Sequence, residues 1–285
     1  MIVLALFLIW SIYVVRKGHL TLHTLFGVYA VTLFLVDYGD VSFDFWLNLY
    51  DLPVHLLNNL DIGGYLGIIL SDGIIFPLVA IVFCYYSVRY HRPWLLSILF
   101  ALMLGTIEFI FVKTGYMVYH YWNHWITPAI VFISLRIFAH FSDRFIHYSP
   151  PISYRLRLLC SIYAFVEWPG AVLGGAMRLF QFKLNIFNNE IFDDRIVAMI
   201  FTTIMGGLAA VLITKIPQKY KIMFFLGLAI TSSIFNLLMH SQGLFLYNYW
   251  NSLLVILRYI IPYLVVYFYD RWEGAYTRRF DPKNA

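Results

Sequence analysis

Long apolar runs, interrupted by short polar segments, dominate the sequence. The runs cover approximately residues 1–15, 20–37, 72–88, 94–113, 124–141, 155–177, 194–215, 221–241 and 251–269. An α-helix needs roughly 20 apolar residues to cross the hydrocarbon core of a membrane, where unpaired backbone groups are too costly to leave exposed. The pattern therefore predicts an all-α polytopic transmembrane helix bundle with about nine spans, of which the first is short.

The composition supports a lipid environment. Of the 285 residues, 61% are hydrophobic and only 12% are charged, and the mean hydropathy is +0.75. Soluble domains carry about 25% charged residues. These values exclude an ordinary soluble domain, and with it a nucleic-acid-binding module, despite the net charge of +5. Cys84 and Cys160 both lie in apolar runs, so no disulfide framework is predicted.

The charged residues predict an orientation. Arg16 and Lys17 follow the first run, which has neither a basic segment before it nor a cleavage site, so we expect a retained helix with its N-terminus outside. Nine spans then place most lysines and arginines, and the C-terminus, on the cytoplasmic side. Acidic residues collect on the outer side. Of these, Asp61, Asp72 and Asp194 are predicted to line an outer vestibule that attracts cations.

An internal repeat is the strongest pattern in the chain. Residues 115–123 and 243–251 both end in Tyr-x-Tyr-Trp-Asn, and the same offset of 128 matches Ala101 with Ala229 and Glu108 with Asn236. The repeat predicts a leading helix at 1–19, two parallel four-helix repeats at 20–148 and 149–270, and a basic cytoplasmic tail at 271–285. Such repeats are common in carriers, although a doubled bundle can equally be a static scaffold.

The acidic outer loop of the first repeat, residues 38–71, contains an apolar run with Pro53. This composition predicts an interfacial or re-entrant helix. Such a helix serves either as a lid or as a surface helix that rests among the lipid headgroups.

Among the ionisable residues inside predicted spans, Glu108, Glu167 and Arg258 lie away from the inner ends, whereas Arg136 is near enough to an inner end to reach the headgroups. A charge at the centre of a membrane costs at least about 2.5–3.5 kcal/mol, so each of the first three is a candidate functional residue. Helical spacing puts Glu167 on one face with Gly170 and Gly174, where the glycines alone are typical of a helix-packing seam. Arg258 needs a hydrogen-bond acceptor at its own depth in the membrane. The predicted depth of Glu108 is closer to that of Arg258 than the depth of Glu167 is. Such a pair is either a structural salt bridge or a gated one.

The eighth predicted span carries a polar stripe that includes Ser232, Ser233, Asn236 and His240. The stripe corresponds to the face of Glu108 in the first repeat. Its side chains either join helices through hydrogen bonds or contribute to a solute site.

Other chemistries receive little support from the sequence. His120 and His124 have the i, i+4 spacing of zinc ligands but lack an acidic third ligand, so no metal site is predicted. Their aromatic neighbours are typical of an interfacial belt. No nucleophile, phosphate-binding or dinucleotide motif occurs, so the chain is more consistent with a protein that is not an enzyme and that has no cofactor.

Several short motifs of the sequence resemble those of a known family. Ser71-Asp72-Gly-Ile-Ile-Phe-Pro77, followed by Glu108-Phe-Ile-Phe-Val-Lys113, Gly115 and Tyr119-x-x-Trp122, is similar to a family of small multi-pass membrane proteins of endospore-forming bacteria. The likeness covers residues 20–140. Family members are single units, so the doubled length is a departure, as is Asn236 in place of Glu108. The resemblance implies a bacterial plasma membrane and a link to spores, but no activity.

Two functions are predicted as alternatives. In the first, the bundle binds or transports a small cationic or zwitterionic solute at an intramembrane site between the two repeats, formed by Glu108, Glu167, Asn236, His240 and Arg258. In the second, the protein is a membrane interaction or signalling protein, linked to sporulation or germination, whose polar residues only join helices. Its partners are then the bilayer and another membrane protein.

Overall fold

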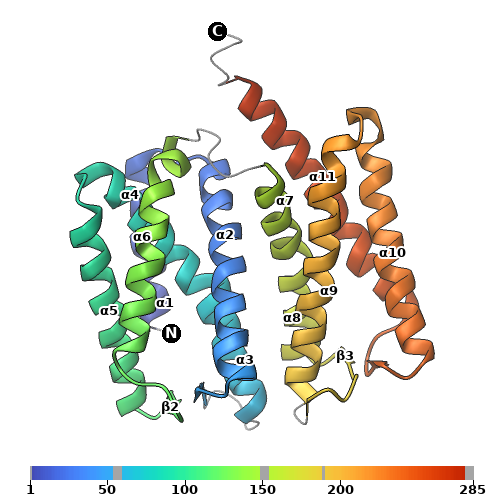
Figure 1. The fold of residues 1–285 in the computed structure, drawn as a ribbon, viewed down its shortest axis with the longest axis horizontal. Helices are drawn as coiled ribbons and strands as arrows, with labels where there is room; N and C mark the ends of the chain where they lie inside the picture. Colours follow the sequence, from blue (N-terminus) through green and yellow to red (C-terminus); the bar gives the residue numbers. More distant parts are fainter. Residues whose placement is uncertain (1, 54–59, 148–153, 188–189, 280–285) are drawn as a thin grey trace. The chain divides into compact units, whose positions relative to one another are not determined.

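The computed structural model describes residues 2–53, 60–147, 154–187 and 190–279 and is almost entirely helical (Figure 1). The chain forms two compact units, unit 1 up to residue 152 and unit 2 from residue 153. Each unit is described by itself. The boundary predicted at 148/149 falls outside the described residues.

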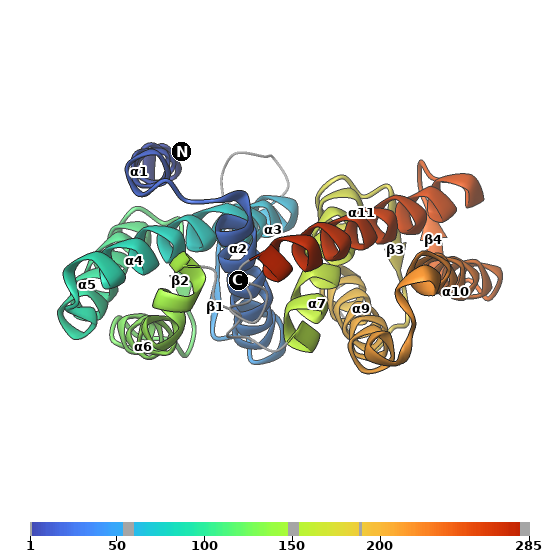
Figure 2. The same cartoon turned by 90° about the horizontal axis from the view of Figure 1, so that it is seen from above.

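Unit 1 contains a helical bundle with one small antiparallel sheet. Its elements are α1 (Ile2–Gly18), α2 (Leu22–Asp40), η1 (Val41–Trp46), β1 (Tyr50–Asp51), α3 (Leu60–Leu70), η2 (Ser71–Ile75), α4 (Phe76–Tyr90), α5 (Pro93–Lys113), β2 (Val118–Tyr119) and α6 (Ile126–His147). Helix α4 packs against α1, α2, α5 and α6. Figure 2 shows α1 on the outside of this group.

Unit 2 also combines a helical bundle with one small antiparallel sheet. Its elements are α7 (Tyr154–Ile162), η3 (Tyr163–Glu167), α8 (Trp168–Ala171), η4 (Val172–Ala176), β3 (Phe180–Phe182), α9 (Glu190–Leu212), η5 (Ile213–Lys215), η6 (Gln218–Tyr220), α10 (Lys221–Ser241), β4 (Phe245–Tyr247) and α11 (Ser252–Arg279). The buried core includes Tyr163, Phe180, Phe225, Tyr259 and Tyr263.

Eight helical segments in the described chain are long and apolar enough to cross a membrane. They are Leu22–Asp44, Gly63–Tyr90, Pro93–Lys113, Ile126–Asp143, Tyr154–Ala176, Glu190–Lys215, Gln218–Ser241 and Ser252–Gly274. They match eight of the nine predicted spans, and a polytopic α-helical membrane protein is therefore indicated. The remaining predicted span is the first in the chain and corresponds to α1, a 17-residue helix. It exposes Ile2, Leu6 and Ile9 and so presents an apolar face, but its role as a span stays a prediction.

Two connecting segments contain more helix than their composition indicates. In the expected outer loop, α3 continues through η2 into α4, so residues 63–90 form one long apolar segment, and the interfacial or re-entrant helix stays a prediction. The polar tail expected from residue 271 begins as an extension of α11, which ends at Arg279.

The π-helical segments interrupt the spans next to acidic residues or prolines. Asp44 lies in η1, Asp72 lies in η2 before Pro77, and Glu167 ends η3 before Pro169. Proline lacks the amide hydrogen that a regular helix needs, and a π turn accommodates the resulting change in register. Pro169, in α8, is accordingly flanked by two π segments, η3 and η4.

In both units the two strands of the small sheet follow corresponding helices. In unit 1, β1 follows α2 and η1 and pairs with β2, which follows α5. In unit 2, β3 follows α7 to η4 and pairs with β4, which follows α10. Gly115 and Gly243 precede β2 and β4 and have positive φ angles of 76° and 73°. Glycine adopts this conformation without the steric cost of a Cβ atom.

We expect Gly115→Ala and Gly243→Ala each to lower the free energy of unfolding by about 1 kcal/mol, because alanine is strained at positive φ. No neighbouring atom lies within 4 Å of the Cβ position at either site, so the effect isolates the backbone. Gly227→Ala, in the middle of α10 and equally uncrowded, is the control and should not destabilise the protein. The measurement is unfolding in detergent. Equal behaviour of all three variants would contradict this account.

Candidate functional site

Four acidic residues of unit 1 gather near the end that carries the β1–β2 sheet, with the buried Asp37 of α2 beside them. Asp40 ends α2, Asp44 lies in η1, Asp72 lies in η2 and Glu108 lies near the end of α5. Asp44, Asp72 and Glu108 are buried, with 5%, 1% and 8% of their surfaces exposed, and Asp40 is partly buried. We call these four residues the acidic cluster.

The hydrogen bonds within the acidic cluster come from uncharged groups. The Tyr50 hydroxyl donates to Asp40 Oδ1 at 3.0 Å, and the Ser71 hydroxyl donates to Asp72 Oδ1 at 2.7 Å. The carboxyl groups of Asp40 and Asp72 lie beside each other. Asp72 Oδ2 is buried and has no hydrogen-bond partner of regular geometry in the described chain.

Glu108 joins the acidic cluster to β2. The Tyr119 hydroxyl donates to Glu108 Oε1 at 2.5 Å, and Thr127 and Trp122 also lie against the carboxylate. Burial, followed by the hydrogen bond to Glu108, raises the pKa of Tyr119. Tyr119 thus remains a donor at neutral pH.

Tyr50, on β1, is surrounded by the acidic cluster. Burial raises its pKa, and the negative charges of Asp40, Asp44 and Asp72 add to the effect. Its ring packs edge-on against Trp122 with centroids 5.2 Å apart. The phenol therefore stays protonated, and the cluster presents its carboxylates around an aromatic ring.

Positive charge is scarce around the acidic cluster. None of its four residues forms an ion pair with a lysine or arginine that the structure describes. His120 and Asp51 of unit 1 form an exposed ion pair at 2.8 Å. Buried carboxylates are costly unless they are protonated or meet a cation.

Unit 2 neutralises its buried acid internally. Glu167, which is 1% exposed, forms an ion pair with Arg195 of α9 and accepts a hydrogen bond from Thr202 at 2.7 Å. Arg195 is itself 3% exposed. The seven-residue spacing of Arg195 and Thr202 places both on one face of α9, toward Glu167.

Arg258 is the second buried arginine of unit 2. Its guanidinium carbon lies 4.0 Å from the centre of the Phe180 ring, and a Cβ at Gly170 would lie 2.4 Å from its Nη2. Asp194 is near enough to interact with it electrostatically. Arg258 is 9% exposed, and its Nε and Nη1 have no hydrogen-bond partner among the described residues.

The other two predicted site residues make local bonds. The Asn236 amide donates to the Tyr259 hydroxyl at 2.8 Å and to the Ser232 carbonyl at 3.1 Å. His240 bonds the Phe245 carbonyl at 2.7 Å and stacks on Tyr247. The bond from Asn236 to Tyr259 joins α10 to α11, and the contacts of His240 join α10 to β4. Such contacts between elements are what the structural alternative for this stripe predicts.

The predicted five-residue site is thus divided between the units. Glu108 belongs to unit 1, whereas Glu167, Asn236, His240 and Arg258 belong to unit 2. A Glu108–Arg258 pair would join the units and stays a prediction.

The predicted outer acidic vestibule had three members. Asp72 and Asp194 are buried side chains, 1% and 7% exposed, rather than open surface groups. The side chain of Asp61, in α3, lies outside the part of the chain that is described.

Sequence reasoning missed Arg195, Asp40 and Asp44 as site residues. Asp40 and Asp44 follow the run 20–37, and Arg195 is the second residue of the run 194–215, so all three were counted with the outer segments. Their helices extend beyond those runs, from residue 22 to 44 and from 190 to 215. The i, i+4 spacing of Asp40 and Asp44 was the available signal.

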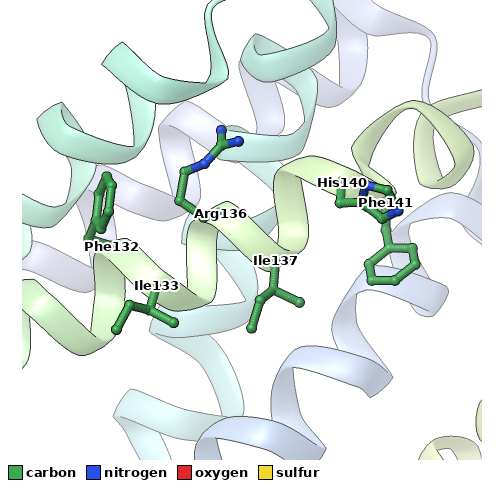
Figure 3. A pocket seen from close by; sticks show the side chains of 6 residues that line it. All are labelled: Phe132, Ile133, Arg136, Ile137, His140 and Phe141. Atoms are coloured by element: carbon green, nitrogen blue, oxygen red, sulfur yellow. The ribbon is translucent and has the colours of Figure 1, made fainter.

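A groove on α6 has a different character. Its lining residues, all from this helix, are Phe132, Ile133, Arg136, Ile137, His140 and Phe141 (Figure 3). Figure 3 shows Arg136 on the other side of the helix from Ile133 and Ile137. Its guanidinium carbon lies 3.9 Å from the Trp94 ring centre. This apolar surface suits contact with lipid chains rather than a polar solute.

Removing one partner of the Glu167–Arg195 pair should be more damaging than removing both. We expect Glu167→Gln or Arg195→Gln to lower the free energy of unfolding by about 3 kcal/mol, because each leaves a buried charge uncompensated. The double variant should recover part of that loss. Glu190→Gln is the control, since Glu190 is exposed and 3.9 Å from Lys183. Strictly additive losses in a detergent unfolding cycle would show that the two charges are not coupled.

Comparison with known proteins assigns no family. No family model, curated protein or solved structure matches the chain. What the protein does is therefore inferred from its own side chains.

Proposed function

We propose that the protein binds a small cationic or zwitterionic solute within the membrane and carries it across, with the acidic cluster of unit 1 as the binding site. The observation that supports this most directly is the gathering of Asp40, Asp44, Asp72 and Glu108 in membrane helices without a described lysine or arginine partner. Such a cluster is stable when it holds protons or a positively charged ligand.

The position of the acidic cluster supports access from one side of the membrane. Asp40 and Asp44 end the apolar segment Leu22–Asp44, and Glu108 lies five residues before the end of Pro93–Lys113. The β1–β2 sheet joins the same helix ends. A solute arriving at this end meets the carboxylates after crossing only the outer part of the membrane.

The contrast with unit 2 also supports the proposal. There Glu167 is matched by Arg195, and Asp194 lies near Arg258. A scaffold with purely structural polar groups is expected to neutralise its buried charges in this way throughout. The four members of the acidic cluster have no lysine or arginine partner among the described residues, which favours solute binding over the alternative of an interaction or signalling protein.

The repeat is part of this proposal. Each unit has a helix that ends in a π segment, a strand, two further helix segments, a strand and a last helix, and the first strand pairs with the second. The sequence repeat at an offset of 128 agrees with this order. Doubled bundles of parallel repeats are a common architecture of carriers.

The proposed location is a bacterial plasma membrane, with the acidic cluster toward the outside and the C-terminus in the cytoplasm. The family resemblance and the distribution of basic residues support it. Because α1 is short, the side on which the N-terminus lies depends on whether α1 spans.

A cysteine at Tyr121 or Tyr249 should react with an impermeant thiol reagent in intact cells, whereas one at Lys219 should react only after the cells are opened. The two tyrosines are 80% and 84% exposed beside β2 and β4. The native Cys84 and Cys160 are buried and provide a silent background. Labelling of Lys219→Cys in intact cells would reverse the orientation.

Solute uptake into proteoliposomes tests the function itself. The protein should take up at least one of methylammonium, choline, putrescine and arginine above the level of protein-free liposomes. Asp72→Asn and Glu108→Gln should each reduce that uptake about tenfold or more, because each removes a carboxylate that compensates the solute charge.

Asp51→Asn is the matched control, because Asp51 is exposed and pairs with His120. It should leave uptake unchanged. Absence of uptake of every solute in the set, or equal uptake by Asp72→Asn and the unaltered protein, would contradict the proposed function.

A further inference from the structure

Backbone contacts in the two units correspond atom for atom. In unit 1, Leu47 N donates to Ser42 O, Leu49 N donates to Phe43 O, and Leu49 O accepts from His120 N and Tyr121 N. Adding 130 to residue numbers 42, 43, 47 and 49, and 128 to 120 and 121, gives the bonds of unit 2. These are Met177 N to Val172 O, Leu179 N to Leu173 O, and Asn248 N and Tyr249 N to Leu179 O.

The unusual torsion angles follow the same offsets. Asn48 and Arg178 have φ angles of 49° and 50°, and Gly115 and Gly243 have 76° and 73°. Since backbone bonds and torsions agree at constant offsets, positions along α2 and η1 can be paired with positions along α7 to η4. The offset of 128 is continued from β2 and β4 into α6 and α11, where Ile130 packs against the cluster that contains Tyr50 as Arg258 lies against Phe180.

This pairing relates the acidic cluster to the surroundings of Arg258. Asp40 corresponds to Gly170, Asp44 to Gly174, Tyr50 to Phe180, Glu108 to Asn236 and Ile130 to Arg258. Asp72, in the segment Gly63–Tyr90, and Asp194, in Glu190–Lys215, are buried acids of the span that follows the first strand of each unit. Unit 2 thus lacks three of the acidic side chains and has gained a cation.

The guanidinium of Arg258 occupies a defined place in unit 2. It lies on the face of Phe180 and against Gly170, where any larger side chain would collide with it. Gly174 also packs on the Phe180 ring, since a Cβ added at Gly174 would lie 2.7 Å from the nearest ring atom. Arginine over an aromatic ring is a favourable cation–π contact.

The corresponding place in unit 1 has the ring and the acids but no cation of its own. Tyr50 replaces Phe180, Asp40 and Asp44 stand where the glycines are, and Ile130 is too short and apolar to supply a charge. The Asp72 side chain is 99% buried and lies beside the Asp40 carboxyl. Its Oδ2 has no hydrogen-bond partner of regular geometry among the described residues.

We infer that unit 1 binds a small organic cation with a guanidinium or primary ammonium group between Tyr50, Asp40, Asp44 and Asp72, and that Arg258 is the covalently attached counterpart of this ligand in unit 2. The inference rests on the proposed function and specifies its solute class. Nitrogen-bound hydrogens satisfy the carboxylate oxygens, and the face of Tyr50 receives the cation. Among the described residues no group of side chains has the arrangement of a metal site, which favours an organic cation.

Binding of methylguanidinium to the full-length protein in lipid nanodiscs at pH 8 tests this inference. At millimolar concentration, well below denaturing levels, methylguanidinium and methylammonium should raise the melting temperature, and tetramethylammonium, which has no N–H donor, should not. Asp44→Asn and Asp40→Asn should weaken the binding of methylguanidinium about tenfold or more, since each removes one charge-assisted contact. Asp51→Asn should bind as the unaltered protein does.

Two further variants use the correspondence between the units. Ile130→Arg places a tethered guanidinium in unit 1 and should abolish the response to methylguanidinium. Arg258→Ala should be destabilised and should regain stability when methylguanidinium fills the vacated place. Asp40→Asn keeps the test decisive if Ile130→Arg does not fold.

Equal responses to methylguanidinium and tetramethylammonium, or full binding by both Asp40→Asn and Asp44→Asn, would overturn the inference. If choline uptake still depends on Asp72 in that case, the proposed function survives without this solute class. If proteoliposome uptake is also absent, both fail.

Discussion

Charge inside the membrane is the constraint on which the structure depends. The chain has few charged residues, yet it buries Asp44, Asp72, Glu108, Glu167, Asp194, Arg195 and Arg258 in or beside membrane helices. Each such group requires a partner or a proton, because hydrocarbon offers neither hydrogen bonds nor a high dielectric. The two units meet this requirement differently. Unit 2 pairs acid with arginine, and unit 1 assembles acids around two tyrosines, Tyr50 and Tyr119.

The π segments follow from the same constraint. A regular helix repeats its faces every 3.6 residues, whereas a π turn inserts one residue and rotates all that follows. In unit 1 the turns at Asp44 and Asp72 fall where acidic side chains must be directed inward from two different helices. The turn that ends at Glu167 does the same in unit 2. Local helix irregularity is therefore concentrated where polar side chains are buried.

The sequence predicted the apolar spans well because membrane thickness sets a length that is visible in the run of residues. Eight of nine spans agree, with ends that differ by a few residues except where α3 joins α4. The small sheets were not predicted, since Tyr119-His120-Tyr121-Trp122 has the composition of an interfacial belt, and pairing with a strand almost seventy residues away leaves no local signal. Glu108 and Glu167 were found from their position inside spans. The partner of Glu167 was not, because Arg195 lies at a span end where a charge is normally solvated.

The proposed function gives a physical meaning to the difference in buried charge between the two units. Two competent cation sites in one chain would each have to be emptied in every cycle, and a solute held by both would be released slowly. A site with a tethered arginine is always occupied, needs no exchange with solvent and keeps its fold whatever the external concentration of solute. The acidic cluster has no lysine or arginine partner among the described residues, so under the proposed function the stability of unit 1 would depend on the concentration of its solute. That dependence couples binding to conformation, since a ligand shifts an equilibrium between states only through a difference in its affinity for them. Under the proposed function, a solute would therefore change the stability of unit 1, whereas Glu167 of unit 2 is already paired with Arg195.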